Sequence, residues 1–338
     1  MFNRKINIAI NGFGRIGRAA FKIILDEHPK LNIVAVNDLT DTATLAHLLE
    51  YDTCYGRYQR KISSTKDSLV VDNQKYPVFS QKDPNLLPWK KLKVDIVLEC
   101  TGKFRSAEEV QAHLDAGAQK VIISAPAKGK VKTIVIGVNE DKISKTDNVV
   151  SCASCTTNCL APVTSVIKSH FGIKKALMTT IHSYTADQNL VDGPHKDLRR
   201  ARAAAMNIVP TTTGAATAVT ETIPSLKNSF DGLAVRVPTP VGSLCDTVFV
   251  LGKKTTVEAV NKAFVIASRG KMKGIIEASN EELVSSDIIG NANSSIVDLK
   301  STMLVGGDLL KVVAWYDNEW GYSHRLVELS YLLKKYLK

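Results

Sequence analysis

Short, continuously apolar runs alternate with helical patterns through the first half of the chain. After the first run, residues 15–28 carry apolar side chains at Ile16, Ala19 and Ile23, the spacing of one helix face. Strands without polar alternation are typical of parallel sheets buried on both faces. The pattern therefore predicts βαβ units and a doubly wound parallel sheet. The expected strands are 6–11, 32–37, 95–100, 120–124, 133–137 and 148–151.

The first strand and helix are joined by a turn of sequence GFGRIG, in which Gly12, Gly14 and Gly17 occupy the three glycine positions of G-x-G-x-x-G. Glycines there permit a tight turn and bring a pyrophosphate close to the helix N-terminus. Asp38 ends the second strand, where it would accept hydrogen bonds from ribose hydroxyls and repel a 2′-phosphate. This context predicts a Rossmann-type NAD site. The alternative is a glycine-rich turn that binds nothing.

The second half has few helices between its strand-like runs, so a mixed or antiparallel sheet is expected there in an α+β catalytic domain. Expected strands are 233–237, 247–251, 295–299 and 309–316. Ser106 with Glu109 and Thr255 with Glu258 fit capping boxes at helix starts. Gly270 is an expected helix C-cap. Residues 321–338 form an amphipathic pattern, and the domain boundary is placed near residue 151.

Length and charge limit the classes of function. The 338 residues suggest two domains, and a net charge of +11 suits an anionic partner, whether a phosphorylated small molecule, nucleic acid or an anionic surface. No run is long enough to span a membrane. The sequence starts without a signal-peptide pattern, so its six cysteines are expected to be reduced thiols in the cytoplasm.

The segment SCASCTTNC, residues 151–159, is the densest in chemistry-bearing side chains. Ser154 is a natural N-cap, which would place Cys155 in the first helical turn, where the macrodipole lowers a thiol's pKa. Two other interpretations compete. Cys152, Cys155 and Cys159 could be metal ligands, but no further Cys/His pair completes a site, so no metal is expected. They could also be buried structural thiols.

Several segments offer partners for this cysteine. His182 ends an apolar strand and could serve as its base, although a lone histidine is more often structural. The basic run 195–202 is interpreted either as a segment that binds a phosphate of substrate or cofactor, or as a solvated loop. Residues 211–216 place hydroxyls and amides at a helix start, a second expected anion site. Arg236 follows a strand and precedes two prolines, where an arginine is usually structural.

Together these segments resemble the family of phosphorylating (type I) glyceraldehyde-3-phosphate dehydrogenases. The resemblance covers essentially the whole chain, through INGFGRIGR, ASCTTNCLAP, HKDLRRARAA, TTTGAA and WYDNEWGYSHR. It implies a Rossmann-type NAD-binding domain of residues 1–151 and about 320–338, and a catalytic domain of residues 152–319. It also implies oxidation of D-glyceraldehyde 3-phosphate to 1,3-bisphosphoglycerate with NAD and inorganic phosphate, in glycolysis or gluconeogenesis.

The resemblance assigns roles residue by residue. Cys155 corresponds to the nucleophile that forms a hemithioacetal and then a thioester, and His182 to its general base. Thr185 and Arg236 correspond to residues that bind the substrate phosphate. The residues that correspond to the inorganic-phosphate site are Ser154, Thr156, Thr213 and Gly214. The cofactor positions are Asn11, Gly12, Gly14, Arg15, Ile16, Asp38, Lys82, Thr101, Gly102, Ser124 and Asn318, the last of which orients the nicotinamide amide.

The resemblance further implies a homotetramer in which a loop from about 183 to 206 crosses to a neighbour's cofactor site.

The sequence departs from the family pattern at three places. Gly193-Pro194 stands where many relatives have Leu-Pro, a pair that helps select NAD. Residues 241–245 differ on a strand of the subunit contact, and Cys152 replaces an asparagine.

Two alternative functions stay open. An erythrose-4-phosphate dehydrogenase shares the cysteine and histidine but hydrolyses its acyl-enzyme, and the anion loop 213–216 speaks against it. A nucleic-acid-binding or surface-binding protein would use the net charge and the basic run 195–202, with steep salt dependence. Intact Cys155, His182, Arg236 and Asn318 favour an enzyme, with nucleic-acid binding as a secondary property only.

Overall fold

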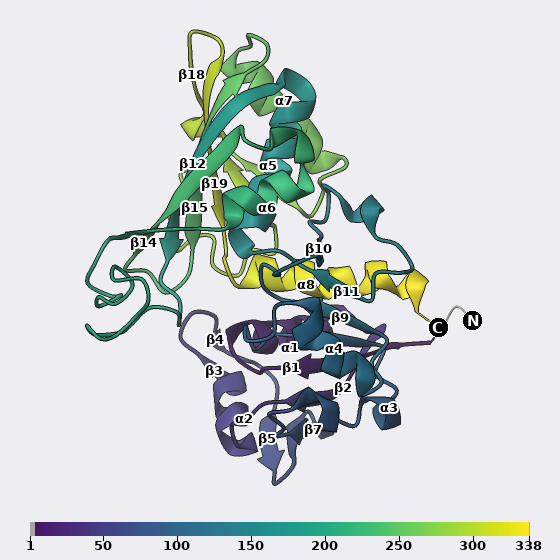
Figure 1. Ribbon diagram of the computed structural model, residues 1–338. Coiled ribbons are helices and arrows are strands. Elements are labelled where there is room, and N and C mark those ends of the chain that lie inside the picture. Colours follow the sequence, from purple (N-terminus) through teal and green to yellow (C-terminus); the bar gives the residue numbers. More distant parts are fainter. Residues whose placement is uncertain (1–3, 338) are drawn as a thin grey trace. The chain divides into compact units, whose positions relative to one another are not determined.

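The computed structural model describes residues 4–337 and divides into two compact units, each with its own sheet (Figure 1). Of the described residues, 4–134, 141–153 and 323–337 belong to the first unit, and residues 135–140 and 154–322 to the second. Residues 1–3 and Lys338, which the expected N-terminal domain includes, lie outside the described residues.

The first unit is built on a nine-stranded sheet in the order β10-β11-β9-β8-β1-β2-β7-β6-β5. The strands from β10 to β7 run parallel, and β5 and β6 add an antiparallel edge. Strand order reverses at β1, which has β2 on one side and β8 on the other, and this creates the switch point where open α/β sheets bind ligands. The strands are β1 (Ile6–Asn11), β2 (Leu31–Asn37), β5 (Ile62–Thr65), β6 (Ser68–Val71), β7 (Gln74–Phe79), β8 (Ile96–Glu99), β9 (Lys120–Ile123), β10 (Lys132–Thr133) and β11 (Val149–Ser151).

Helices connect several of these strands, and two of them, α1 and α4, lie where the sequence predicted them. They are α1 (Arg15–Glu27), α2 (Thr42–Glu50), α3 (Trp89–Leu92) and α4 (Ala107–Asp115), with a small hairpin of β3 (Tyr51–Asp52) and β4 (Gly56–Arg57). The Ser106 side chain and the Glu109 carboxylate form the expected capping box of α4. The expected strand 133–137 is wrong, because β10 ends at Thr133 and the chain then turns, reaching a positive φ of 87° at Gly137.

The second unit contains a mixed eight-stranded sheet, ordered β13-β14-β12-β15-β19-β17-β16, with β18 paired to β19. Pairs of both directions occur, so the expected mixed sheet is confirmed. The strands are β12 (Ile173–Ser183), β13 (Val209–Thr211), β14 (Phe230–Val237), β15 (Ser243–Leu251), β16 (Ile276–Ser279), β17 (Ser295–Asp298), β18 (Met303–Val305) and β19 (Leu309–Tyr316).

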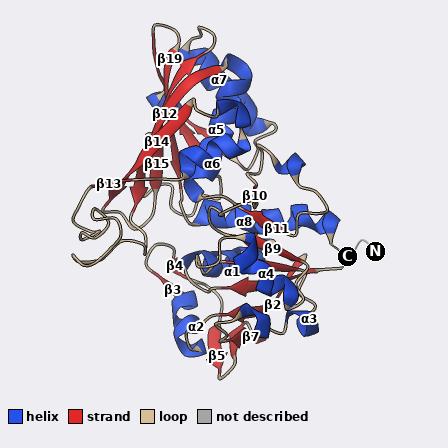
Figure 2. Cartoon of the chain, viewed as in Figure 1, coloured by secondary structure: helices blue, strands red, loops and turns tan. Residues whose placement is uncertain are grey.

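Three helices lie along one side of this sheet (Figure 2): α5 (Cys155–Phe171), α6 (Ala215–Thr222) and α7 (Val257–Arg269). The N-cap of α7 is Thr256 rather than Thr255, because the Thr256 hydroxyl accepts from the Ala259 amide. Gly270 is the C-cap as expected. The last helix, α8 (Trp320–Leu333), buries Leu326, Leu329 and Leu333. Among the residues that the structure describes, no helix combines the length and apolar character needed to cross a bilayer.

Candidate active site

Glycines shape the turn between β1 and α1. Gly12 has a φ of +92°, and a Cβ there would come within 2.7 Å of the Thr101 amide nitrogen. A Cβ on Gly17 would lie 2.1 Å from the Gly12 carbonyl oxygen, so helix and turn pack too closely for any side chain. Gly14 differs, since a Cβ there would meet nothing within 4 Å. Gly14 is the N-cap of α1 and faces open space, the condition for a phosphate to approach a helix start.

A cavity of about 510 Å³ opens beside this turn. Leu39, Cys100, Lys103 and Phe104 contribute to its wall. Six of the expected cofactor residues line it, namely Asn11, Gly12, Gly14, Asp38, Lys82 and Thr101. Four others in the same unit are not part of the lining: Arg15, Ile16, Gly102 and Ser124.

The Asp38 carboxylate faces the glycine turn. Its Oδ2 accepts from the Phe13 amide at 2.7 Å and its Oδ1 from the Thr40 amide at 3.0 Å. Each carboxylate oxygen has two acceptor positions, so both retain capacity for a ribose hydroxyl. Arg15 is committed elsewhere, since its guanidinium lies 2.6 Å from the Asp52 carboxylate and over the Tyr55 ring.

Behind this cavity, Glu99 organises a buried polar network. One carboxylate oxygen accepts from the amide and hydroxyl of Thr101, and the other from the Asn11 side chain and from His113 Nε2 at 3.1 Å. The Trp89 indole N–H donates to His113 Nδ1 at 2.9 Å. Because indole only donates, the imidazole proton lies on Nε2 and points to Glu99. The network fixes both Asn11 and the backbone at Thr101, two residues of the cavity wall.

In the second unit, Cys155 begins helix α5. Ser154 is the N-cap, as predicted, and its hydroxyl accepts from the Thr157 amide at 3.0 Å. Ala153 precedes it with a φ of +60°, which turns the chain sharply into the helix. Pro162 lies inside α5 instead of in its first turn. The local sequence thus sets the nucleophile candidate at the positive end of a long helix.

Cys155 and His182 meet across the sequence. The Cys155 Sγ lies 3.4 Å from His182 Nε2, and His182 Nδ1 lies 2.6 Å from the Ser183 carbonyl oxygen. Since a carbonyl only accepts, Nδ1 carries the proton and Nε2 presents a lone pair to the thiol. His182 is the penultimate residue of β12, and the Tyr316 ring packs edge-on against it at 5.9 Å. The pair has the geometry of a nucleophile with its base.

Burial dominates the protonation of this pair. It raises the pKa of Cys155 to about 11, although Arg236 and hydrogen bonds from Thr156 act in the opposite direction. Burial also lowers the pKa of His182 to about 3, and Arg236 adds to that effect. The lowered thiol pKa expected from the helix start is therefore wrong for this structure, because loss of solvent outweighs Arg236 and the hydrogen bonds from Thr156. The resting pair is a neutral thiol beside a neutral imidazole.

Arg236 lies next to His182 in the sheet, since the two are register partners on β14 and β12. Its Nη1 donates to the Ser183 carbonyl and to the Thr185 hydroxyl, both at 3.1 Å. Its Nε is buried and has no hydrogen-bond partner among the residues that the structure describes. A buried donor without an acceptor is costly, which makes this guanidinium a ready anion site. The structure thus brings Arg236 and Thr185 together with the Cys155–His182 pair.

The other expected anion residues lie at two helix starts. Thr156, the second residue of α5, shares a hydrogen bond of 2.9 Å with the Tyr316 hydroxyl. Gly214 is the N-cap of α6, and the Thr213 hydroxyl accepts from the Ala215 amide at 3.2 Å. Helices α5 and α6 pack against each other. Asn318 holds the turn after β14, where its Oδ1 accepts from the Gly242 amide and the Ser243 hydroxyl.

Two functional-site neighbours escaped the sequence analysis. Tyr316 links Thr156 with Thr180 through its hydroxyl, at 2.9 and 2.8 Å, beneath the cysteine and histidine. Glu99 anchors the cavity of the first unit. Each residue ends an apolar strand. A polar side chain at the end of an apolar strand is the sequence feature that could have indicated both residues.

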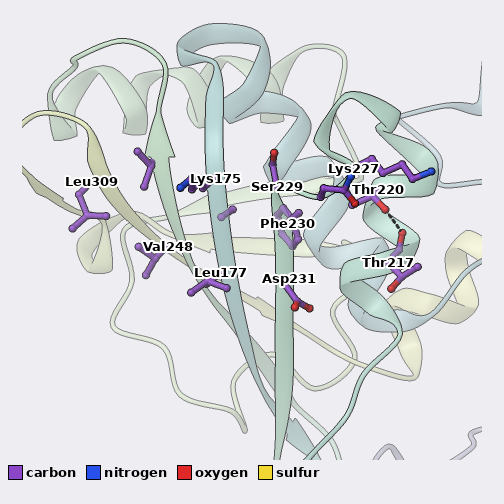
Figure 3. Close-up of a pocket in the computed structure, with 13 residues that line it drawn as sticks. Lys175, Leu177, Thr217, Thr220, Lys227, Ser229, Phe230, Asp231, Val248 and Leu309 are labelled. Atoms are coloured by element: carbon purple, nitrogen blue, oxygen red, sulfur yellow. Dashed lines mark hydrogen bonds between the residues drawn. The ribbon is translucent and has the colours of Figure 1, made fainter.

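A second cavity, of about 880 Å³, lies on the sheet of the second unit and contains none of the expected catalytic residues (Figure 3). Strands β12, β14 and β15 form its floor, with Leu177, Phe230 and Val248 among the lining side chains. Leu177 is 67% exposed. This is an open sheet surface and not a catalytic pocket.

A dinucleotide-binding sheet in one unit and a cysteine–histidine pair in contact in the other define an NAD-dependent oxidoreductase. Comparison with known proteins gives the family. The glyceraldehyde 3-phosphate dehydrogenase NAD binding domain matches residues 6–107, and the C-terminal domain of the same enzyme matches residues 154–318. The chain belongs to the glyceraldehyde-3-phosphate dehydrogenase family.

Curated relatives match over nearly their whole length. The glyceraldehyde-3-phosphate dehydrogenase of Thermotoga maritima is 54% identical over 329 residues, which is 97% of this chain and 99% of the relative. That of Geobacillus stearothermophilus is 53% identical over 326 residues, 96% of this chain and 97% of the relative. Glyceraldehyde-3-phosphate dehydrogenase 1 of Bacillus subtilis is 52% identical over 332 residues, covering 98% and 99%.

Proposed function

We propose that the protein oxidises D-glyceraldehyde 3-phosphate to 1,3-bisphosphoglycerate, using NAD and inorganic phosphate, as a step of glycolysis or gluconeogenesis. The observation that carries the proposal is the contact of 3.4 Å between Cys155 Sγ and His182 Nε2, with Arg236 alongside. A thiol, a base and an anion-binding guanidinium are the groups that oxidation of a phosphorylated aldehyde through a thioester requires.

The first step adds the thiol to the aldehyde. His182 Nε2 takes the proton of Cys155 as sulfur attacks the carbonyl carbon, and returns it to the oxygen to give a hemithioacetal. Because the resting groups are neutral, the thiol must lose its proton during this step, and His182 Nε2 lies within reach to accept it. Nδ1 stays bonded to the Ser183 carbonyl, which stabilises the transient imidazolium.

The second step makes a thioester and then transfers its acyl group. His182 removes the hemithioacetal hydroxyl proton while the C–H bond breaks, leaving the acyl group on Cys155. NAD, when bound, supplies the acceptor for the hydride. Inorganic phosphate then attacks the acyl carbon and the cysteine sulfur leaves. The sulfur takes the proton that the attacking phosphate gives up, and His182 loses its proton to solvent. The redox energy is thereby retained in an acyl phosphate.

Two anion sites support this sequence. Arg236 and Thr185 would hold the substrate phosphate, and the buried Arg236 Nε without a partner favours an anionic ligand there. Ser154, Thr156, Thr213 and Gly214 would hold the inorganic phosphate at the starts of α5 and α6. Helix starts stabilise negative charge, which supports that assignment.

The first unit fits NAD. The cavity beside Gly12 and Gly14, the glycine close approaches and the Asp38 carboxylate suit a pyrophosphate followed by a ribose. We assign cofactor contacts to the positions implied by the family pattern: Asn11, Gly12, Gly14, Arg15, Ile16, Asp38, Lys82, Thr101, Gly102, Ser124 and Asn318. We assign residues 1–151 and about 320–338 to the NAD-binding domain and residues 152–319 to the catalytic domain.

We further propose a homotetramer working in the cytoplasm. Leu177, Leu233 and Leu309 are 67%, 45% and 42% exposed on the sheet of the second unit. In the loop before β13, Leu198 and Met206 are 81% and 84% exposed. Exposed apolar surface of this extent is typical of subunit contacts. Six free cysteines suit a reducing compartment.

The test is NAD reduction followed by absorbance, with glyceraldehyde 3-phosphate and with or without inorganic phosphate. We expect turnover that depends on phosphate. Turnover indifferent to phosphate would mean that water takes the acyl group, as in an erythrose-4-phosphate dehydrogenase. The Cys155→Ser variant should lose turnover but bind NAD nearly as well as the wild type. Substantial residual turnover in that variant would contradict the nucleophile assignment.

A further inference from the structure

The first unit contains a cluster of metal-ligating side chains away from both cavities. Glu27 is the last residue of α1, His28 is its C-cap, and His324 belongs to α8. One potential ligand atom of each lies within 4.8 Å of the other two. The Glu27 Oε1 and His324 Nε2 atoms are 3.6 Å apart. We propose that Glu27, His28 and His324 bind a transition-metal dication of the Zn²⁺, Co²⁺ or Ni²⁺ type.

The donor set selects the class of metal. Two imidazoles and one carboxylate occur together in zinc sites that have three protein ligands and a water molecule in the fourth position. Imidazole nitrogen suits zinc, cobalt and nickel, whereas calcium and magnesium prefer all-oxygen sites. No cysteine belongs to the cluster, so oxidation of the protein's thiols would leave it intact.

The spacing is close to that of a bound site. Two ligand atoms at about 2.1 Å from a tetrahedral zinc ion are about 3.4 Å apart. The Glu27–His324 separation of 3.6 Å already matches this value, and since no separation exceeds 4.8 Å, none must shrink by more than roughly 1.4 Å. Glu27 can make such a movement, because its side chain is 49% exposed and ends a helix.

Charges near the cluster are compatible with a cation. Asp26 precedes Glu27 in the sequence and adds a negative charge, and the guanidinium of Arg325, next to His324, is paired with the Glu328 carboxylate.

Packing also orients the second histidine. The His28 ring lies against the Tyr331 ring, with centroids 5.3 Å apart. Tyr331 stands two helical turns beyond His324 on α8, so both project from one side of that helix. A bound metal would tie the end of α1 to α8 across nearly 300 residues of sequence. The sequence analysis missed this group because no local spacing connects its members.

The test uses Zn²⁺ and Co²⁺ with full-length protein whose reactive thiols have been alkylated. Isothermal titration with Zn²⁺ should show one site, which should raise the melting temperature of the alkylated protein. His28→Gln and Glu27→Gln should each weaken binding at least about tenfold, while His170→Gln, at an exposed histidine, should bind as the wild type does. Co²⁺ should give a visible d–d spectrum without a thiolate charge-transfer band.

The variants keep the result interpretable. His324→Gln replaces a buried side chain and could disrupt the packing of α8. The conclusion therefore depends on the variants of Glu27, which is exposed, and His28, which is half-buried. Unchanged Zn²⁺ affinity in both of these variants would overturn the proposal. Loss of all binding on alkylation would also overturn it, because the metal would then have been held by cysteine.

Discussion

Glu99→Gln is the most informative perturbation of the first unit, because it keeps the shape of a buried side chain and changes only its hydrogen-bond chemistry. The Glu99 carboxylate accepts four hydrogen bonds from three residues, two of which line the cofactor cavity. A glutamine amide replaces one of the two acceptor oxygens with a donor. In either orientation, the NH2 group of the glutamine faces at least one N–H donor that cannot rotate to become an acceptor.

The favoured orientation directs the amide nitrogen toward Thr101. The Thr101 hydroxyl can rotate to accept a hydrogen bond from the amide, but the Thr101 backbone N–H can only donate. This buried N–H therefore loses its acceptor, which lowers the free energy of unfolding by about 1–3 kcal/mol. The two bonds kept on the oxygen side, from Asn11 and His113, lose charge assistance worth about 1 kcal/mol each. A neutral amide costs less to bury than a carboxylate, which offsets part of the loss. We expect a net destabilisation of about 2 kcal/mol.

That value corresponds to a melting temperature lower by about 4–8 °C for a unit of this size. Thermal unfolding by circular dichroism measures it, with Glu281→Gln, at an exposed glutamate, as the control for loss of one charge. Titration with NAD should also show weaker binding, because the Thr101 backbone forms part of the cavity wall. A melting temperature within about 1 °C of the wild type would refute the argument that this carboxylate holds the network together.

Three further predictions concern the site. His182→Asn should lower the rate of the thiol-dependent step about 10²–10⁴-fold in single-turnover assays, and a loss below about tenfold would be inconsistent with a general base. Gly12→Ala should reduce both stability and NAD affinity, since its Cβ would lie 2.7 Å from backbone, whereas Gly14→Ala should weaken NAD binding without lowering the melting temperature. Because the pKa of Cys155 is raised to about 11, its alkylation by iodoacetamide should accelerate steadily from pH 6 to pH 10, and a plateau already reached near pH 7 would show a preformed thiolate.

Much of the first unit was predictable because local signals agree with one another there. The continuously apolar runs gave the parallel strands, and the capping box at Ser106 gave the start of α4. The strand expected at 133–137 failed for a specific reason. Its apolar side chains Ile134 and Val135 are buried, but the chain leaves the sheet there to enter the second unit. Here a single backbone hydrogen bond to the sheet, from the Ile134 amide to the Ser151 carbonyl, precedes the departure, and burial without continued pairing produces the same apolar pattern as a strand.

The start of helix α5 was predictable from local sequence, and the electrostatics of the cysteine were not. Ser154 as N-cap follows from side-chain chemistry within four residues, and the structure confirms it. The protonation of Cys155 depends instead on how completely the surrounding strands remove solvent, which sequence spacing does not report. Tyr316 is similar: its hydroxyl reaches Thr156 and Thr180, residues that the sheet brings together from distant parts of the sequence.

The position of Arg236 gives it opposite effects on the two reacting groups. Its charge lowers the pKa of Cys155, which favours the thiolate, and lowers that of His182, which disfavours the imidazolium. When the proton passes from sulfur to nitrogen, both charged forms arise together and these two effects largely cancel. Arg236 therefore contributes little to the proton transfer itself. We infer that its charge acts mainly on a third group, the substrate phosphate, for which its buried Nε has no competing partner in the structure.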